Sequence, residues 1–271
     1  MKIVLLIIAA LISHSTAVAG EKFAPELYAF YNGTPRLPFE KEAEFLKETG
    51  YAGINQIYAT AIGRKLEERV AAYEKVGVKV LSVYLPATND PVKEEDVKAL
   101  ANRGGMIELT VKTITLEVIA SIRETATMAA KLKMKVALYP HAGHAVATMP
   151  QAMDLIVKVN HPNLGVMFNL CHFLKSEKAE DLEKVLAQAG DRLFAVSTCG
   201  ADADGKGWGQ LIQTLDKGNF PQERLFKILK KMDFKGPVGL QCYAIKGDPK
   251  ANLATSMKAW RELMKMLNAA G

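Results

Sequence analysis

The chain has 271 residues, of which 49% are hydrophobic and 24% are charged, and its formal net charge is +6. This composition is typical of a folded globular protein and excludes a disordered or low-complexity chain. The basic residues are spread along the sequence, so we expect no nucleic-acid partner.

The first residues predict a secretory signal peptide over residues 1–19. Lys2 supplies a positive n-region, Ile3 to Ile12 form an apolar h-region, and Ala17-Val18-Ala19 is a small-residue cleavage site. The apolar run is shorter than the ~20 residues of a membrane span, so we expect no stable membrane anchor after cleavage. An uncleaved anchor is the alternative. We therefore expect an exported protein, periplasmic or secreted, with a mature chain of residues 20–271.

After residue 20, short apolar runs alternate with amphipathic helical patterns, and no linker divides them. The predicted strands are residues 26–32, 51–58, 78–87, 107–113, 135–143, 164–174, 192–202 and 237–245. The predicted helices are residues 39–49, 64–76, 92–103, 116–133, 149–159, 179–189, 222–232 and 249–268. Strict alternation of this kind implies parallel strands, and eight units predict the α/β class and a single (β/α)8 TIM barrel.

In the later strands, large apolar residues alternate with small or polar ones. We expect the apolar face to pack on the helices and the other face to line the barrel lumen. Sites in this fold lie at the C-terminal ends of the strands. Structural polarity explains any single polar residue there as well as function does, but their convergence favours a site. The candidates are Glu108, Lys112, Tyr139, His141, Asn169, His172, Ser197, Gln241 and Tyr243.

Three cysteines, Cys171, Cys199 and Cys242, show no CxxC spacing. Their positions on separate strands do not promise the geometry of a disulfide or a thiolate metal site. We expect three free thiols.

Three segments resemble the later strands of the xylose-isomerase-like barrel superfamily of sugar phosphate isomerases and epimerases. They are Leu138-Tyr139-Pro140-His141, Val166-Met167-Phe168-Asn169-Leu170-Cys171-His172 and Val238-Gly239-Leu240-Gln241-Cys242-Tyr243. Gly200-Ala201-Asp202 and the stretch that begins at Trp208 resemble an exported subgroup of that family.

The resemblance implies a divalent metal held by carboxylates and histidine at the ends of strands 5 to 8. On this alignment the ligand carboxylates of strands 5, 6 and 8 fall on Tyr139, Asn169 and Gln241. The strand-6 histidine is kept as His172, and the strand-7 histidine falls near Ser197. Every anionic ligand position is therefore neutral here, which disfavours a hard cation. His141, His172, Asn169 and Gln241 remain a candidate set for Mn²⁺ or Zn²⁺. A metal-free polar sugar pocket is the alternative.

The chemistry that the resemblance implies is proton abstraction next to a sugar carbonyl, by an isomerase, an epimerase or a keto-sugar lyase or hydratase. It requires a base and a group that stabilises the enediolate oxygen. His141 and His172 are the preferred bases, and Glu108, Asp202 and Asp204 are alternatives. Without a metal, the candidate donors to the oxyanion are Lys112, Asn169, Gln241 and Tyr139. Lys112 is also a candidate Schiff-base nucleophile, although pairing with Glu108 explains it better. The residues expected to bind substrate are Tyr139, Asn169, Ser197, Trp208, Gln241 and Tyr243.

Export makes a phosphorylated substrate improbable, so we expect a free, oxidised or keto carbohydrate. A non-catalytic sugar-binding barrel that has lost its metal is the second hypothesis. A nuclease like endonuclease IV needs a multi-zinc cluster, for which the five histidines of the whole chain are too few. A homodimer remains open.

Overall fold

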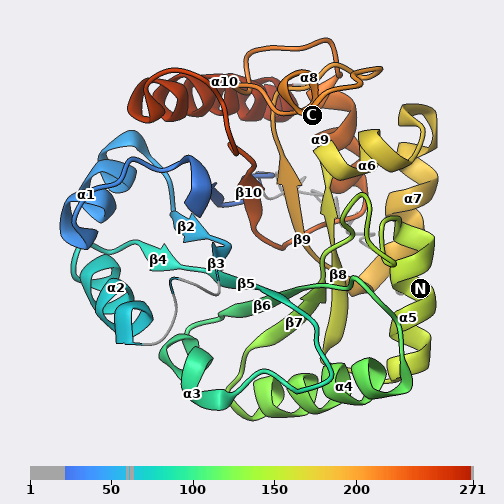
Figure 1. Ribbon diagram of the computed structural model, residues 1–271. Helices are drawn as coiled ribbons and strands as arrows, with labels where there is room; N and C mark the ends of the chain where they lie inside the picture. The colour runs from blue at the N-terminus through green and yellow to red at the C-terminus, as the bar shows by residue number, and fades with distance from the viewer. Residues whose placement is uncertain (1–21, 59–60, 62–63, 270–271) are drawn as a thin grey trace, which may run out of the picture.

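A computed structural model describes residues 22–58, 61 and 64–269, which form a barrel of strands inside a ring of helices (Figure 1). The predicted signal peptide lies outside the described residues. The fold class predicted from the sequence is confirmed. The strands are shorter than the apolar runs that predicted them, because each run extends into the loops at its ends.

Every strand of the described range runs parallel to its neighbours, in the order β3-β5-β6-β7-β8-β9-β10-β1-β2-β4. Gln56 divides one strand into β2 and β3, and Leu81 divides the next into β4 and β5. Because β2 pairs with β4 and β3 pairs with β5, the described segments make up eight strands that form a closed barrel. The segments are β1 (Leu27–Phe30), β2 (Gly53–Asn55), β3 (Ile57–Tyr58), β4 (Lys79–Val80), β5 (Ser82–Pro86), β6 (Met106–Thr110), β7 (Lys135–Leu138), β8 (Leu164–Asn169), β9 (Leu193–Thr198) and β10 (Val238–Leu240).

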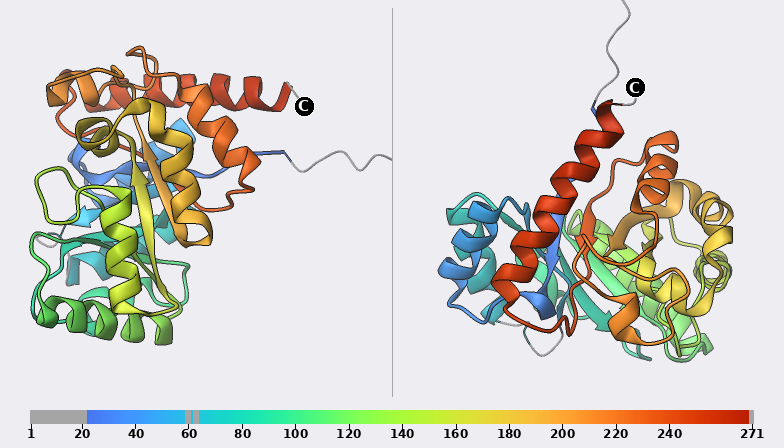
Figure 2. Two further views of the ribbon diagram at one scale, coloured as in Figure 1. Left: turned by 90° about the vertical axis from the view of Figure 1, so that its right-hand side faces the viewer. Right: turned by 90° about the horizontal axis from the view of Figure 1, so that it is seen from above.

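The helices surround the strands, and α10 lies across one side of the barrel (Figure 2). They are α1 (Phe39–Thr49), α2 (Arg64–Lys75), α3 (Glu94–Val97), α4 (Leu116–Lys131), α5 (Met149–Val159), α6 (Leu170–Ser176), α7 (Leu182–Ala189), α8 (Trp208–Leu211), α9 (Gln222–Lys231) and α10 (Pro249–Ala269). Among the described residues, no helix combines the length and the apolarity that crossing a membrane requires.

Burial follows the alternation of side chains in the later strands. A small cluster of Met106, Ala137, Tyr139, Met167 and Ala195 fills the lumen. Their neighbours along the strands, such as Ile107, Val136 and Phe168, belong to the main core between the strands and the helices. All three cysteines are buried free thiols, as predicted.

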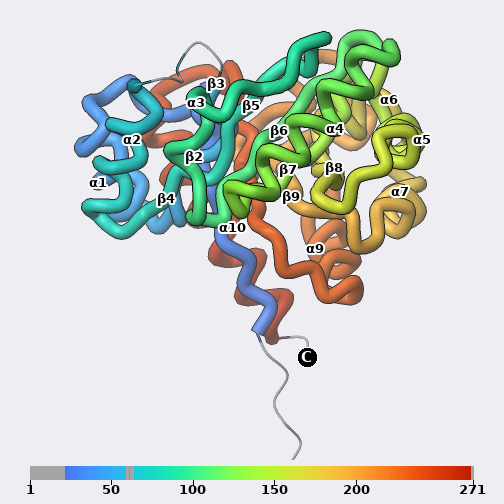
Figure 3. Tube along the Cα trace, turned by 90° about the horizontal axis from the view of Figure 1, so that it is seen from below, coloured from blue at the N-terminus to red at the C-terminus, as the bar shows by residue number. Residues whose placement is uncertain are grey.

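The two ends of the described chain meet at one side of the barrel (Figure 3). The backbone N–H of Phe23 donates to the side-chain oxygen of Asn268 at 3.0 Å, and the Asn268 amide donates to the Phe23 carbonyl at 2.9 Å. This pair attaches the start of the described chain to the end of α10.

The structure departs from the predicted elements in three places. The strand predicted over residues 164–174 ends at Asn169, whose side chain accepts a hydrogen bond from the backbone of His172 and caps α6. A continuous apolar run does not distinguish a strand from a buried helix, which explains the error. The helix predicted over residues 92–103 shortens to α3 and one 3₁₀ turn. Helix α8 was not predicted.

Candidate functional site

A cavity of about 350 Å³ opens at the C-terminal ends of the strands. Its walls come from residues that end a strand or follow one, and from α6 and the region of α8. The lining residues are Phe30, Asn32, Tyr58, Tyr84, Tyr139, His141, His172, Trp208, Ile212, Gln241 and Tyr243. No carboxylate, lysine or arginine of the described chain belongs to this lining.

Aromatic rings form much of the wall. Tyr58 contacts Phe30 and Tyr84, with ring centroids 5.9 and 5.3 Å apart, and Tyr84 meets Tyr139 edge-on at 4.8 Å. Trp208 meets the His172 ring edge-on at 5.2 Å. Such rings offer an apolar face to the C–H groups of a ligand, while hydroxyl and indole N–H groups provide hydrogen bonds.

The rings of two histidines lie against each other in the cavity at an angle of 39°, and the backbone of Ala142 fixes the proton of each. The centroids of the His141 and His172 rings are 4.1 Å apart. The Nδ1 of His141 is 2.9 Å from the Ala142 carbonyl oxygen, which can only accept, so this nitrogen carries the proton. The Ala142 N–H donates to Nδ1 of His172 at 3.2 Å. In its neutral form, His172 must therefore carry its proton on Nε2.

Burial keeps both rings neutral. It lowers the pKa of His172 to about 3, with His141 and His144 adding to the effect. Burial also lowers the pKa of His141, the hydrogen bond to Ala142 opposes this shift, and the charge of Lys112 reinforces it. At neutral pH, His141 thus presents a lone pair on Nε2 and His172 presents a donor on Nε2. In the part of the chain that the structure describes, neither Nε2 has a hydrogen-bond partner.

Tyr139 connects the two amide side chains at the predicted ligand positions. Its hydroxyl oxygen accepts from Nδ2 of Asn169 and from Nε2 of Gln241, the latter at 3.4 Å. Burial, with additional contributions from Cys171 and Tyr84, raises the pKa of Tyr139 well above its ordinary value. Tyr139 is therefore a neutral phenol.

These residues do not fit the predicted metal site. Asn169 uses Oδ1 to accept from the Cys171 thiol at 3.0 Å and from the backbone of His172, and Gln241 uses Oε1 to accept from the backbone of Tyr243 at 3.0 Å. Two neutral imidazoles remain, without an anionic ligand. Throughout the described residues, no group of three or more His, Cys, Asp or Glu side chains is placed to hold a metal ion.

Two predicted site residues lie in the lumen and outside the cavity lining. Glu108 is 1% exposed and accepts from Ser82 at 2.6 Å and from the Gln56 amide at 2.5 Å. It does not pair with Lys112. Burial raises the pKa of Glu108 to about 7, although both hydrogen bonds oppose the shift. Ser197 is buried, and its hydroxyl has no partner within the described chain.

Lys112 and Asp202 do not reach the cavity wall. Lys112 is exposed and acts on the site through its charge, which lowers the pKa of His141 and His144. Asp202 is half-buried, and its backbone N–H donates to the Gln210 carbonyl at 2.8 Å. Of the predicted residues, the cavity thus brings together Tyr139, His141, His172, Trp208, Gln241 and Tyr243, with Asn169 directly behind Tyr139.

Sequence reasoning missed the cavity residues that come from the first three strands of the barrel, which are β1, β2 with β3, and β4 with β5. Asn32, Tyr58 and Tyr84 line the cavity, and His144 stacks on His141 with centroids 4.2 Å apart. The tyrosines at the C-terminal ends of two apolar runs were the available signal. The alternation was harder to follow in strand 2, because Gln56 has a positive φ of 59° and interrupts it.

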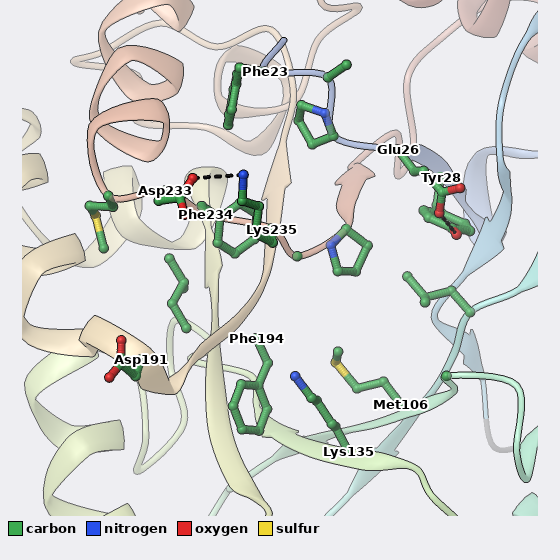
Figure 4. A pocket seen from close by; sticks show the side chains of 18 of the residues that line it. Phe23, Glu26, Tyr28, Met106, Lys135, Asp191, Phe194, Asp233, Phe234 and Lys235 are labelled. Atoms are coloured by element: carbon green, nitrogen blue, oxygen red, sulfur yellow. Dashed lines mark hydrogen bonds and ion pairs between the residues drawn. The ribbon is translucent and has the colours of Figure 1, made fainter. Parts of the chain in front are cut away.

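A larger basin, about 620 Å³, lies at the opposite end of the barrel (Figure 4). Phe23, Met106, Phe194 and Phe234 line it together with charged side chains. Several of these charges are already engaged: Lys235 pairs with Asp233 at 2.8 Å, and Lys135 lies 4.4 Å from the centre of the Phe194 ring. Functional groups of this fold converge at the other end, so we place the site in the smaller cavity.

The fold and the site define a class: a (β/α)8 barrel with a neutral, aromatic cavity that contains paired histidines. The chain belongs to the family described as xylose isomerase-like TIM barrel, whose model matches residues 65–269.

Individual relatives are distant. A protein from Synechocystis named probable ketose 3-epimerase is 28% identical over 134 residues, which are 48% of this chain and 42% of that protein. The structure of 3-keto-D-glucoside 4-epimerase from E. coli gives a TM-score of 0.71 at 18% identity, over 88% of this chain and 100% of that one. A probable 3-DHS dehydratase from Bacillus anthracis gives 0.70 at 14% identity, over 88% and 99%. At these identities, the two structures show a shared fold.

Proposed function

We propose that the protein is an exported enzyme that moves a proton on the carbon next to a sugar carbonyl, as an isomerase, an epimerase or a keto-sugar lyase or hydratase. One observation carries this proposal. The backbone of Ala142 holds His141 and His172 in opposite tautomers, side by side in the cavity. A base and a hydrogen-bond donor are the two groups that this chemistry requires.

The reaction begins when the Nε2 lone pair of His141 takes the proton from the carbon. The C–H bonding pair becomes the new C=C bond, and the carbonyl π pair moves onto the oxygen. The Nε2–H of His172 donates a hydrogen bond to that oxygen as its negative charge develops. For an isomer, the proton returns to the former carbonyl carbon while the hydroxyl proton on the first carbon passes to the enolate oxygen, so that the carbonyl forms at the first carbon. For an epimer, water delivers a proton to the opposite face and His141 releases its proton to solvent. For elimination, the enolate pair re-forms the carbonyl as the β-hydroxyl leaves with the proton of His141 as water.

The cavity favours an uncharged carbohydrate. Its volume of about 350 Å³ is at the small end of the ~300–1,000 Å³ range of ligand pockets. Tyr58, Tyr84, Tyr243 and Trp208 offer aromatic faces, and no cationic side chain of the described lining is available for a phosphate. This agrees with the predicted export, because phosphorylated sugars are cytoplasmic metabolites.

The relatives support the same chemistry. The names of the Synechocystis protein and of the E. coli structure denote epimerases of a ketose and of a 3-keto-glucoside, and the Bacillus structure is named a dehydratase. Two of these names describe a reaction at a sugar.

The test uses the mature chain, residues 20–271, in D₂O with EDTA. Methyl 3-keto-D-glucoside, related 3-keto-glycosides, aldoses and ketoses are each incubated with it and followed by proton NMR. We expect loss of the proton next to the carbonyl of at least one sugar, faster than in enzyme-free buffer. Absence of exchange and of product with the whole panel, with and without added Mn²⁺ or Zn²⁺, contradicts the proposal.

A non-catalytic sugar-binding barrel is the second candidate, and the absence of carboxylates from the described lining favours it. This candidate predicts saturable carbohydrate binding by calorimetry that EDTA does not change, with neither exchange nor product. Catalytic exchange that disappears on substitution of His141 excludes it.

A further inference from the structure

The hydroxyl of Tyr139 is held by two amides at the inner wall of the cavity. Asn169 and Gln241 both donate to its oxygen. The orientation of each amide follows from its other contacts: Oδ1 of Asn169 accepts from the backbone of His172, and Oε1 of Gln241 accepts from the backbone of Tyr243. The NH₂ groups must therefore face the phenol.

This arrangement leaves the phenol with one unused group, its own proton. Both acceptor positions of the oxygen are occupied, so the hydroxyl can interact with a further partner only by donating. Among the described residues, no hydrogen bond uses this proton. The side chain is buried, 2% exposed, and still forms part of the cavity wall. A buried hydroxyl proton without an acceptor points to an acceptor supplied by a ligand.

The second unused donor of the site lies next to it. The rings of Tyr139 and His172 meet edge-on, with centroids 5.5 Å apart, and the free proton of His172 is on Nε2. Both groups line the same cavity and neither can accept at these positions. A carbonyl or enolate oxygen, which only accepts, suits two donors. A hydroxyl suits them less well, because its own proton requires an acceptor elsewhere.

We infer that the Tyr139 hydroxyl and His172 Nε2–H together bind one carbonyl oxygen of the substrate, and that this pair selects a keto sugar over the corresponding alcohol. This inference rests on the proposed function and assigns the electrophilic role to Tyr139 in addition to His172. The amides hold the phenol oxygen before substrate arrives, so no reorganisation is required as charge develops on the substrate oxygen. Tyr139 thereby fills the position that the resemblance assigned to a metal ligand, and supplies a donor where relatives of that kind supply a cation.

The test compares Tyr139→Phe with Tyr51→Phe, which removes an equally buried hydroxyl that donates to the Leu253 carbonyl at 2.9 Å and does not line the cavity. Calorimetry in EDTA measures the affinity for methyl 3-keto-D-glucoside and for methyl D-glucoside. We expect the parent and Tyr51→Phe to prefer the keto form, and Tyr139→Phe to lose that preference. With any sugar that is turned over, we expect kcat to fall about 10²–10³-fold in Tyr139→Phe, with a smaller rise in KM that matches the lost affinity for the keto form.

A second substitution tests the role of the proton with both amide contacts retained. Tyr139→3-fluorotyrosine strengthens the donor without removing the oxygen, so the preference for the keto form should increase. An unchanged keto preference in both position-139 variants, or a parent that prefers the alcohol, overturns the inference. If the parent prefers the keto form in this Tyr139-dependent way but turns nothing over, the donor pair stands and the proposed reaction fails.

Discussion

The backbone of Ala142 contacts two histidine side chains at once, and this is the main feature of the site at the scale of single residues. Its carbonyl and its N–H fix opposite tautomers of His141 and His172. The sequence predicted both histidines as candidate bases, but it could not show which ring acts as the base and which as the hydrogen-bond donor. The backbone groups of Ala142 that decide this lie in a loop whose conformation no sequence pattern predicted.

We expect His141→Asn to lower kcat/KM by about 10²–10⁴, the usual contribution of a general base. The variant keeps a polar side chain, so the cavity should remain folded and should still bind sugar. Kinetics with the best sugar of the panel measures the effect. His161→Asn is the matched control, because His161 lies at an exposed helix end and contacts Thr127. Equal losses in the two variants would remove His141 from the mechanism.

The pH dependence of the rate follows from the same pair. The pKa of His141 is lowered from 6.5, and only its neutral form accepts a proton. The value of kcat/KM should therefore be constant near neutral pH and fall at acid pH, with a midpoint below 6.5. The His172 ring, whose pKa is about 3, stays neutral over this range and keeps its donor on Nε2. A pH–rate profile tests this, and a midpoint above 6.5 would show that another group is the base.

Glu108 should make the protein less stable as pH rises. Its pKa is about 7 in the folded chain and 4.5 in the reference state, so the folded state binds more protons between these values. Ionisation of Glu108 should lower the free energy of unfolding by up to about 3 kcal/mol between pH 4.5 and pH 7, and Glu108→Gln should remove this decrease. Urea unfolding of Glu108→Gln and of the parent at pH 5 and pH 8 measures the difference, so that other titrating groups cancel. Glu262→Gln, at an exposed position, is the control. The expectation is refuted if Glu108→Gln changes the free energy of unfolding by the same amount at pH 5 and at pH 8.

At the scale of elements, two short helices place cavity residues and neither was predicted as a helix. Asn169 ends β8 and caps α6, which places His172 in the first turn of that helix. Helix α8 carries Trp208, which is 41% exposed and lies against His172. Both helices follow strand-like or polar stretches of sequence. They are too short to show a helical periodicity that would distinguish them from loops.

Trp208 should contribute to sugar affinity and little to stability, because it is half-exposed at the rim. We expect Trp208→Ala to weaken sugar binding about tenfold, a loss of about 1.4 kcal/mol, without a change in the unfolding midpoint. Trp260 is the other tryptophan of the chain and is packed on Phe226 in the core. Trp260→Phe should keep a ligand-dependent change of fluorescence that Trp208→Ala loses. Retention of that signal in Trp208→Ala would place the sugar elsewhere.

At the scale of the molecule, the repeated alternation of strand and helix patterns predicted the barrel. That prediction worked because β6 to β9 keep a regular alternation, which Met106, Ala137, Met167 and Ala195 show in the lumen cluster. The alternation could not be followed through β2 and β3, because Gln56 interrupts the strand between them and both Asn55 and Gln56 are buried. A one-residue irregularity exchanges the two faces of a strand, and sequence alone does not locate it.

The central claim is that the backbone N–H and C=O of one residue, Ala142, hold two neutral histidines in opposite tautomers at the proposed sugar site. Nitrogen-15 NMR of the histidine rings of residues 20–271 at neutral pH, with assignment by His141→Asn and His172→Asn, tests it most directly. We predict a proton on Nδ1 and a bare Nε2 for His141, and a bare Nδ1 and a proton on Nε2 for His172. The same tautomer in both rings, or a positively charged ring at either position, would contradict the account.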